Sequence, residues 1–141
     1  MDIRDELPIA FDNSKACDKL FKEVTKKTDV SPVIRGYIGA VHLAKAKHAI
    51  IFKKMGYFNK GTKILDAAVA EAPTEVELRF LRMTIQLNAP GFLNYSSEIE
   101  EDRAFVFTHF READADIQRR MRDYIESSGY FSTEEIAQIQ E

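Results

Sequence analysis

The apolar residues recur every three to four positions along most of the chain, and no stretch shows convincing strand alternation. This spacing is typical of helices packed by one face or more, so we predict an all-α fold of six to seven helices. The predicted helices cover about 13–27, 32–55, 58–72, 75–88, a stretch after Ser96 or Ser97 that ends before Asp114, 115–127, and a short helix after Ser132. A single bent helix in place of the fifth and sixth is the alternative.

Capping residues set most of these boundaries, because helix ends need side chains or turns to satisfy their orphan backbone groups. The predicted N-caps are Asn13 or Ser14, Ser31 followed by Pro32, Thr74, Ser96 or Ser97, Asp114, and Ser132 with Glu135 in a capping box. The predicted stops are Thr28–Asp29, Pro73, Asn88–Gly91 and Gly129. The loop up to Tyr95 carries Phe92 and Leu93, so we expect it to pack against the protein.

Residues 42–75 form the central predicted motif, an antiparallel helical hairpin with its turn at Gly56–Tyr57. Gly61 and Ala68 lie seven residues apart on one helix face, and small residues there allow two helix backbones to approach closely. We expect Leu65 and Phe52 to fill the remaining gap between the helices.

The spacing of this motif resembles a tetratricopeptide repeat, a 34-residue helical hairpin. The matching positions are Ala49, Phe52, Gly61, Leu65, Ala68 and Pro73. In such repeats the first helix lines a peptide groove, which the alignment assigns here to Leu43, Ala46, Ile50 and Lys53. The known two-carboxylate clamp is absent, because Ala46 and Ile50 replace its Lys and Asn. Only one unit matches well, so flanking helices must close the core.

The chain also resembles a family of short bacterial helical proteins of uncharacterised activity. The resemblance is carried by AKHA at 46–49, GYFNKG at 56–61, ELRFLRMTIQLNAPGFLNY at 77–95, EED at 100–102 and SGYFSTEEI at 128–136. The resemblance implies a shared fold but does not indicate an activity. Members often begin with an export signal, so export is the alternative to the cytoplasmic location that the sequence as written predicts.

Charge is distributed unevenly along the chain. Residues 30–65 hold seven Lys or Arg and no acid, whereas residues 66–102 hold eight acids and two Arg. One interpretation is that the basic hairpin packs beside acidic helices. The other is a basic surface for an acidic protein or peptide, with Lys47 and Lys53 among its binding residues.

Arg79 and Arg82 lie with Gln86 on a narrow polar stripe of an otherwise apolar helix. An unpaired buried guanidinium would cost several kcal/mol. These arginines must therefore meet either carboxylates, with Glu75, Glu98, Glu100 and Asp102 as candidates, or an anionic ligand. In the second case Gln86, Asn88 and His48 would complete the binding cleft, although a core histidine bonded to a neighbouring helix is the simpler interpretation of His48.

Several classes of function find no support. The single Cys17 and the spacing of the three histidines predict no metal site, and residues 56–63 match a phosphate-binding loop only in their glycines. No apolar run is long enough to span a membrane, and overall acidity argues against nucleic-acid binding. With 141 residues we predict one domain, 1–141, without cofactor or metal. The predicted function is a non-enzymatic protein-interaction module, and the alternative is a small-anion binder or enzyme built on Arg79, Arg82 and His48.

Overall fold

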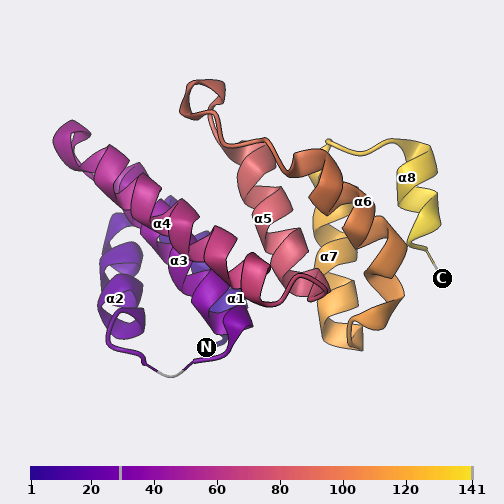
Figure 1. The fold of residues 1–141 in the computed structure, drawn as a ribbon, viewed down its shortest axis with the longest axis horizontal. Coiled ribbons are helices and arrows are strands. Elements are labelled where there is room, and N and C mark those ends of the chain that lie inside the picture. Colours follow the sequence, from indigo (N-terminus) through magenta and orange to yellow (C-terminus); the bar gives the residue numbers. More distant parts are fainter. Residues whose placement is uncertain (29, 141) are drawn as a thin grey trace. The chain divides into compact units, whose positions relative to one another are not determined.

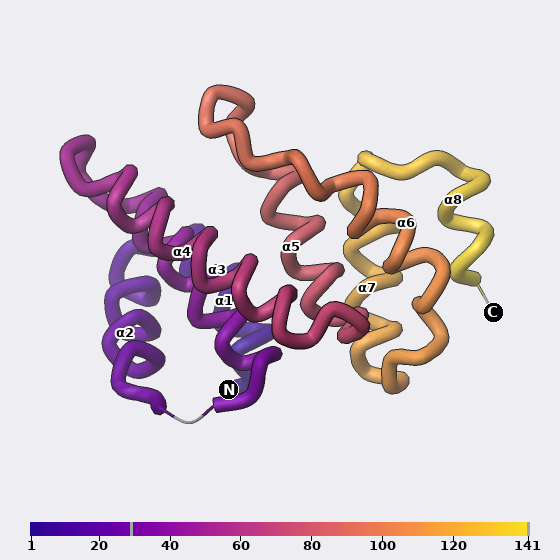
Figure 2. The backbone as a smooth tube through the Cα atoms, viewed as in Figure 1, coloured from indigo at the N-terminus to yellow at the C-terminus, as the bar shows by residue number. Residues whose placement is uncertain are grey.

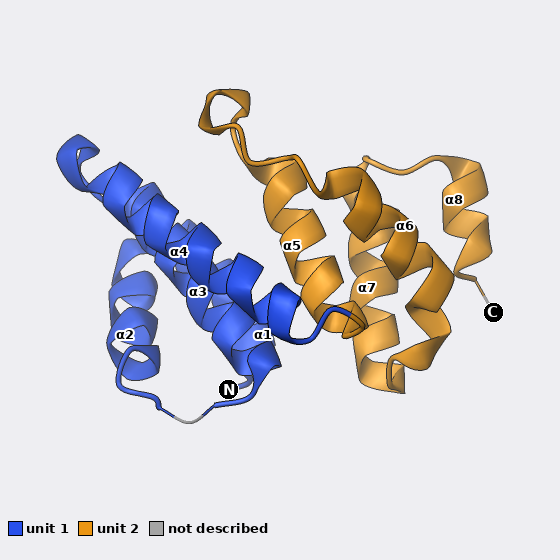
Figure 3. Cartoon of the chain, in the orientation of Figure 1, with its two compact units in different colours: residues 1–73 blue, residues 74–141 orange. Residues whose placement is uncertain are grey.

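The computed structural model describes residues 1–28 and 30–140, and every regular element within them is helical, which confirms the all-α prediction. These residues form eight α-helices and two 3-10 turns (Figure 1). They divide into two compact units, Met1–Pro73 and Thr74–Glu141 (Figure 3), each described by itself below. A single domain stays a prediction. Asp29, part of the predicted break at Thr28–Asp29, lies outside the described residues.

Unit 1 consists of four helices, α1 Ile3–Asp12, α2 Ser14–Val24, α3 Pro32–His48 and α4 Ile51–Glu71. Helices α1, α2 and α3 pack on one another, and α4 pairs with α3 along most of its length. Their shared core is made by Ala10, Cys17, Leu20, Val24, Val41, Ala44, Leu65 and Ala68. The N-caps predicted at Asn13 and Ser31 are confirmed, since their side chains accept from Ala16 N at 2.9 Å and Ile34 N at 3.3 Å.

Helix α1 lies ahead of the first predicted helix and accounts for the eighth α-helix. Its N-cap Asp2 accepts from Arg4 N at 2.9 Å, and Leu7 and Ala10 are buried. Pro8 lies inside the helix, where a missing N–H and a crowded ring oppose helix formation. Packing of the buried face outweighs that local cost.

The turn of the hairpin lies at Ala49–Ile50, so the predicted turn at Gly56–Tyr57 is wrong. Both Ala49 and Ile50 have extended backbone angles, with ψ of 155°. Lys54 donates to the carbonyls of Lys47 at 2.8 Å and Ala46 at 3.3 Å, which satisfies the end of α3. Gly56 stays helical because an interior glycine costs only about 1 kcal/mol, less than the packing of a long helix provides.

Close helix contact at Gly61 is confirmed, and its partner is Gly39 of α3. A Cβ on Gly61 would lie 2.7 Å from the Gly39 carbonyl oxygen, and one on Gly39 would lie 2.8 Å from the Gly61 carbonyl oxygen. Leu65 and Ala68 are buried beside this contact as predicted. Phe52 does not fill the gap, since its side chain is 91% exposed.

Unit 2 consists of α5 Val76–Asn88, the 3-10 turn Gly91–Leu93, α6 Ile99–His109, the 3-10 turn Phe110–Glu112, α7 Ala115–Ser128 and α8 Thr133–Gln138. Its core joins Val76 and Met83 of α5, Val106 and Phe110 at the end of α6, Ile117, Met121 and Ile125 of α7, and Phe131 and Ile139 around α8. The 3-10 turn after α6 separates it from α7, so the single bent helix is excluded.

Only some of the helix caps predicted for unit 2 are confirmed. Asp114 accepts from Ile117 N at 2.9 Å, Ser132 and Glu135 form the predicted capping box, and Gly129 ends α7 with φ of 80°. Thr74, Ser96 and Ser97 are not the caps, because α5 and α6 begin one or two residues later after Glu75 and Glu98.

The loop after α5 packs only in part. Tyr95 is buried as expected, whereas Phe92 is 86% exposed. The prediction that this loop packs down is therefore wrong at Phe92.

Candidate functional site

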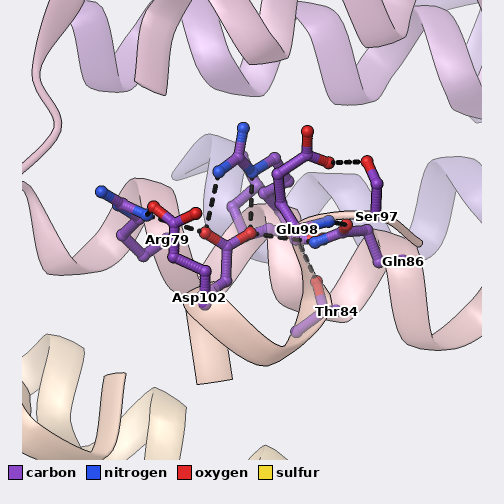
Figure 4. A network of polar contacts seen from close by, with 9 residues as sticks. Arg79, Thr84, Gln86, Ser97, Glu98 and Asp102 are labelled. Atoms are coloured by element: carbon purple, nitrogen blue, oxygen red, sulfur yellow. Dashed lines mark hydrogen bonds and ion pairs between the residues drawn. The ribbon is translucent and has the colours of Figure 1, made fainter. Parts of the chain in front are cut away.

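A buried carboxylate, Asp102, holds the polar stripe of α5 against α6 (Figure 4). Asp102 lies in the first turn of α6 and is fully buried. Arg82 contacts it with two donors, Nε to Oδ2 at 2.7 Å and Nη2 to Oδ1 at 2.9 Å. Such a two-bond pair fixes orientation as well as charge.

Arg79, one helical turn earlier on α5, shares the same carboxylate. Its Nη1 donates to Asp102 Oδ1 at 3.1 Å and to Glu101 Oε1 at 2.9 Å, and its guanidinium stacks 4.8 Å from the Phe105 ring centre. The hydrogen bond from Arg79 lowers the pKa of the Glu101 carboxyl. The two arginines therefore face two carboxylates, and the local charges balance.

Gln86 completes the arrangement and also bonds the backbone at the start of α6. Its Nε2 donates to Asp102 Oδ2 at 2.9 Å, and its Oε1 accepts from the backbone N of Glu98 at 3.1 Å (Figure 4). Arg79, Arg82 and Gln86 reach one carboxylate because spacings of three, four and seven share a helix face. In the described residues no buried side-chain nitrogen or oxygen lacks a hydrogen-bond partner.

Of the four carboxylates that the sequence suggests as partners for these arginines, Asp102 takes that role. Glu75 instead caps its own helix by accepting from Glu77 N at 3.4 Å, and Glu98 accepts from Ser97 Oγ at 2.5 Å. Glu101 is a partner that the sequence did not single out, although it neighbours Asp102. The guanidinium donors are engaged within the protein, so this site has the properties of a structural hub between helices.

Asn88 lies apart from that hub, at the exposed end of α5. Its Nδ2 donates to Thr84 O at 2.7 Å and to the Tyr124 hydroxyl at 3.1 Å, and its Oδ1 accepts from the Tyr130 hydroxyl at 3.4 Å. Burial raises the pKa of Tyr124. Asn88 thus ties α5 to α7 and to the segment before α8.

The two histidines of unit 1 are bonded to backbone carbonyls and contribute to its packing. His48 Nε2 bonds to the Ala10 carbonyl at 2.8 Å, the link to a neighbouring helix that the simpler interpretation predicts. His42 is 3% exposed, and its Nδ1 donates to the Ile38 carbonyl at 2.9 Å. Burial lowers the pKa of His42. Sequence reasoning gave His42 no role, and only its place among the apolar residues of α3 signalled its burial.

The most unusual surface of unit 1 is the end of the α3–α4 hairpin, which projects past α1 and α2 (Figure 1, Figure 2). Ile50, Ile51 and Phe52 are 64%, 77% and 91% exposed, and Met55 is 48% exposed. We call these four residues the tip patch. Exposed apolar side chains are ordinary when scattered, but adjoining ones mark binding surfaces.

Lysines flank the tip patch in the sequence. Lys47 and Lys53 are exposed, as the predicted basic surface requires, and Lys54 caps α3. No acid occurs between Val30 and Leu65 to neutralise them in sequence. The sequence missed the patch itself because repeat spacing assigned Phe52 to the helix interface.

No protein-family model, curated protein or solved structure matches this chain. In the part of the chain that the structure describes, no helix combines the length and apolarity needed to cross a bilayer. No group of three or more His, Cys, Asp or Glu side chains among those residues is arranged to hold a metal ion.

Proposed function

We propose that the chain is a non-enzymatic protein-interaction module whose docking surface is the tip patch with its neighbouring lysines. The observation that carries this is the exposure of three consecutive large apolar residues, Ile50, Ile51 and Phe52, at the end of a projecting hairpin. Burying each such side chain contributes about 1.5–3 kcal/mol. Two or three of them are enough to anchor an interface.

The likeness to a tetratricopeptide repeat supports this proposal in architecture. Helices α3 and α4 are antiparallel, since Arg35 pairs with Glu71 near one end and Lys54 contacts Ala46 near the other. Of the predicted groove residues, Leu43 and Ala46 are buried, whereas Ile50 and Lys53 are exposed. Binding at the hairpin end is therefore favoured over binding along a groove. Bacterial origin and a cytoplasmic location stay predictions.

The alternative function, an anion-binding or catalytic cleft, gains no geometric support. Arg79 and Arg82 donate to Asp102 and Glu101, and His48 Nε2 bonds to a backbone carbonyl. A ligand would have to displace a fully buried carboxylate. Removing such a partner costs about 3–5 kcal/mol.

Site-specific photo-crosslinking in the native cell tests the proposal. A photoreactive phenylalanine analogue replaces Phe52, and the control places it at Phe92, an equally exposed aromatic residue of unit 2. We expect discrete protein adducts, identified by mass spectrometry, from position 52 and not from position 92. The absence of protein adducts at 52, or identical adducts at both positions, contradicts the proposal.

Vesicle flotation distinguishes a protein partner of the tip patch from a lipid surface. The full chain is mixed with vesicles of phosphatidylcholine alone and with phosphatidylserine added, at low and at moderate salt. We expect the chain to stay unbound with both vesicle compositions at either salt concentration. Flotation with anionic vesicles that Phe52→Ser abolishes would make the tip a membrane contact and overturn the proposal.

A further inference from the structure

One apolar stripe of α4 runs from the buried second half of the helix to its exposed start. Ile51, Met55, Leu65 and Val69 follow the spacing of a single helix stripe. Leu65 and Val69 are at most 3% exposed, whereas Met55 is 48% and Ile51 77% exposed. The stripe thus changes from covered to uncovered along one continuous helix.

Helix α3 does not extend to the start of α4. Helix α3 stops at His48, and Lys54 contacts its last carbonyls, so residues 51–53 of α4 extend past it. A Cβ added to Gly56 would meet no atom within 4 Å beyond its own stretch of helix, which shows how open this end is. A stripe that elsewhere packs on a helix is shaped to receive another one.

The charge near this stripe indicates which kind of partner helix would bind there. Lys47 and Lys53 flank Ile51 in the sequence and are exposed, Lys60 is exposed two turns further along α4, and residues 30–65 contain no acid. A second copy of this chain would bring the same lysines against them. Like charges at an interface weaken association, and opposite charges favour it.

We infer that the tip patch receives an acidic amphipathic helix of a partner protein, which packs on Ile51, Phe52 and Met55 and places carboxylates beside Lys47 and Lys53. This inference rests on the proposed function, since it names the partner of the same site. The helix would lie on the side of α4 that carries Ile51, Phe52 and Met55, away from the face that Gly61 packs against α3. Its apolar residues supply the affinity, and its carboxylates supply selectivity.

A displayed library of amphipathic helices, selected on the full chain, tests the inference. The library keeps a constant apolar face and leaves the polar positions free to be acidic, basic or neutral. We expect selection to enrich Asp and Glu at positions flanking the apolar face. Each selected helix, once purified, should lose about tenfold in affinity on Phe52→Ser and a similar amount on Lys47→Glu/Lys53→Glu.

The matched control is Lys19→Glu/Lys26→Glu, a double charge reversal of exposed lysines on and just after α2, which should leave affinity unchanged. Enrichment of basic or neutral helices, or selected helices that bind the tip variants as tightly as the wild type, overturns the inference. Self-association of the chain that Phe52→Ser abolishes also overturns it.

The two proposals fail in different ways. If crosslinking at Phe52 yields a protein but the attached peptide is basic, neutral or a strand, the docking surface stands and the acidic helix is wrong. If crosslinking yields no protein adduct, the proposed function itself fails, whatever the library selects.

Discussion

The two units place their unusual residues in opposite ways. Unit 2 buries charge, with Asp102 inaccessible and Arg79 and Arg82 less than a tenth exposed, while unit 1 exposes Ile51 and Phe52. The buried charges pair within the same unit, whereas the side chains of Ile51 and Phe52 are mostly exposed. A buried charge can be explained by internal pairing, whereas a cluster of exposed apolar residues at a projecting end marks a candidate binding surface.

The largest effect is expected from Asp102→Ala, which breaks the buried hub of unit 2. Both arginines would then lose their shared carboxylate, and the free energy of unfolding should fall by about 3–5 kcal/mol. Urea denaturation followed by circular dichroism measures this change.

Two further variants sharpen that result. Glu101→Ala removes a carboxylate that is 66% exposed, so it should cost at most about 1 kcal/mol. The triple variant Asp102→Leu/Arg79→Met/Arg82→Leu replaces the charges with apolar groups and should recover most of the loss. If Asp102→Ala is as mild as Glu101→Ala, the hub does not hold α5 and α6 together.

Gly61→Ala should have the next largest effect, because it disrupts the closest backbone contact of unit 1. The added Cβ would meet the Gly39 carbonyl oxygen at 2.7 Å and Leu43 Cγ at 2.9 Å. We expect a loss of about 1–3 kcal/mol in denaturation. Gly56→Ala is the control on the same helix, where open space and better helix propensity should stabilise by about 0.5–1 kcal/mol. Effects of the same sign at both positions would refute the contact.

The pH dependence of unit 1 should come in part from His42. Its folded pKa lies below the 6.5 of a free histidine because burial disfavours the charged ring. The unfolded state then binds the proton first as the pH falls, so the stability that neutral His42 contributes is complete above pH 6.5. It is lost as the pH falls from 6.5 through the lower folded pKa.

Denaturation of the wild type and of His42→Gln between about pH 7.5 and pH 5 checks this prediction. The wild type should lose more stability than the variant over that range. The carboxylates with lowered pKa, Asp18, Glu71, Glu101, Asp116 and Glu135, act in a lower window, below their free values of 3.8 to 4.5. Parallel curves for the two proteins above about pH 5 would show that His42 does not titrate as described.

The smallest effect on stability is expected at the tip. Phe52→Ala should change the free energy of unfolding by no more than about 0.5 kcal/mol, since the ring is already in solvent. Phe110→Ala, the same substitution at a residue 2% exposed in unit 2, should cost about 3–5 kcal/mol. A large loss at Phe52 would mean that the ring packs within the protein.

Sequence reasoning succeeded at four of the six predicted N-caps, where the signal is local. Asn13, Ser31, Asp114 and Ser132 cap helices as predicted, because a cap depends on a side chain and backbone within three residues. The pairing of Arg79 and Arg82 with a carboxylate was also foreseen as one of two possibilities, since the cost of leaving a buried guanidinium unpaired does not depend on the fold.

Sequence reasoning failed where tertiary packing decides which of several locally possible structures forms. The hairpin turns at Ala49–Ile50, without glycine or proline, while Gly56 remains inside α4. That shift of the turn moved Phe52 from a predicted interface to solvent, so one error concealed the tip patch. Helix α1 was not predicted, and it contains Pro8, whose local cost the packing of its buried face outweighs.

The backbone contact between Gly39 and Gly61 has a mechanical consequence. The residues three and four positions from Gly61 lie nearest its face of α4, and they all carry a Cβ that cannot fit where Gly61 now sits: Tyr57, Phe58, Ile64 and Leu65. Sliding α4 by one helical turn along α3 would therefore bring a side chain against the Gly39 backbone, so this contact allows a single register of the two helices. A force directed along α4 would therefore be resisted by this contact and not absorbed by slippage between the helices.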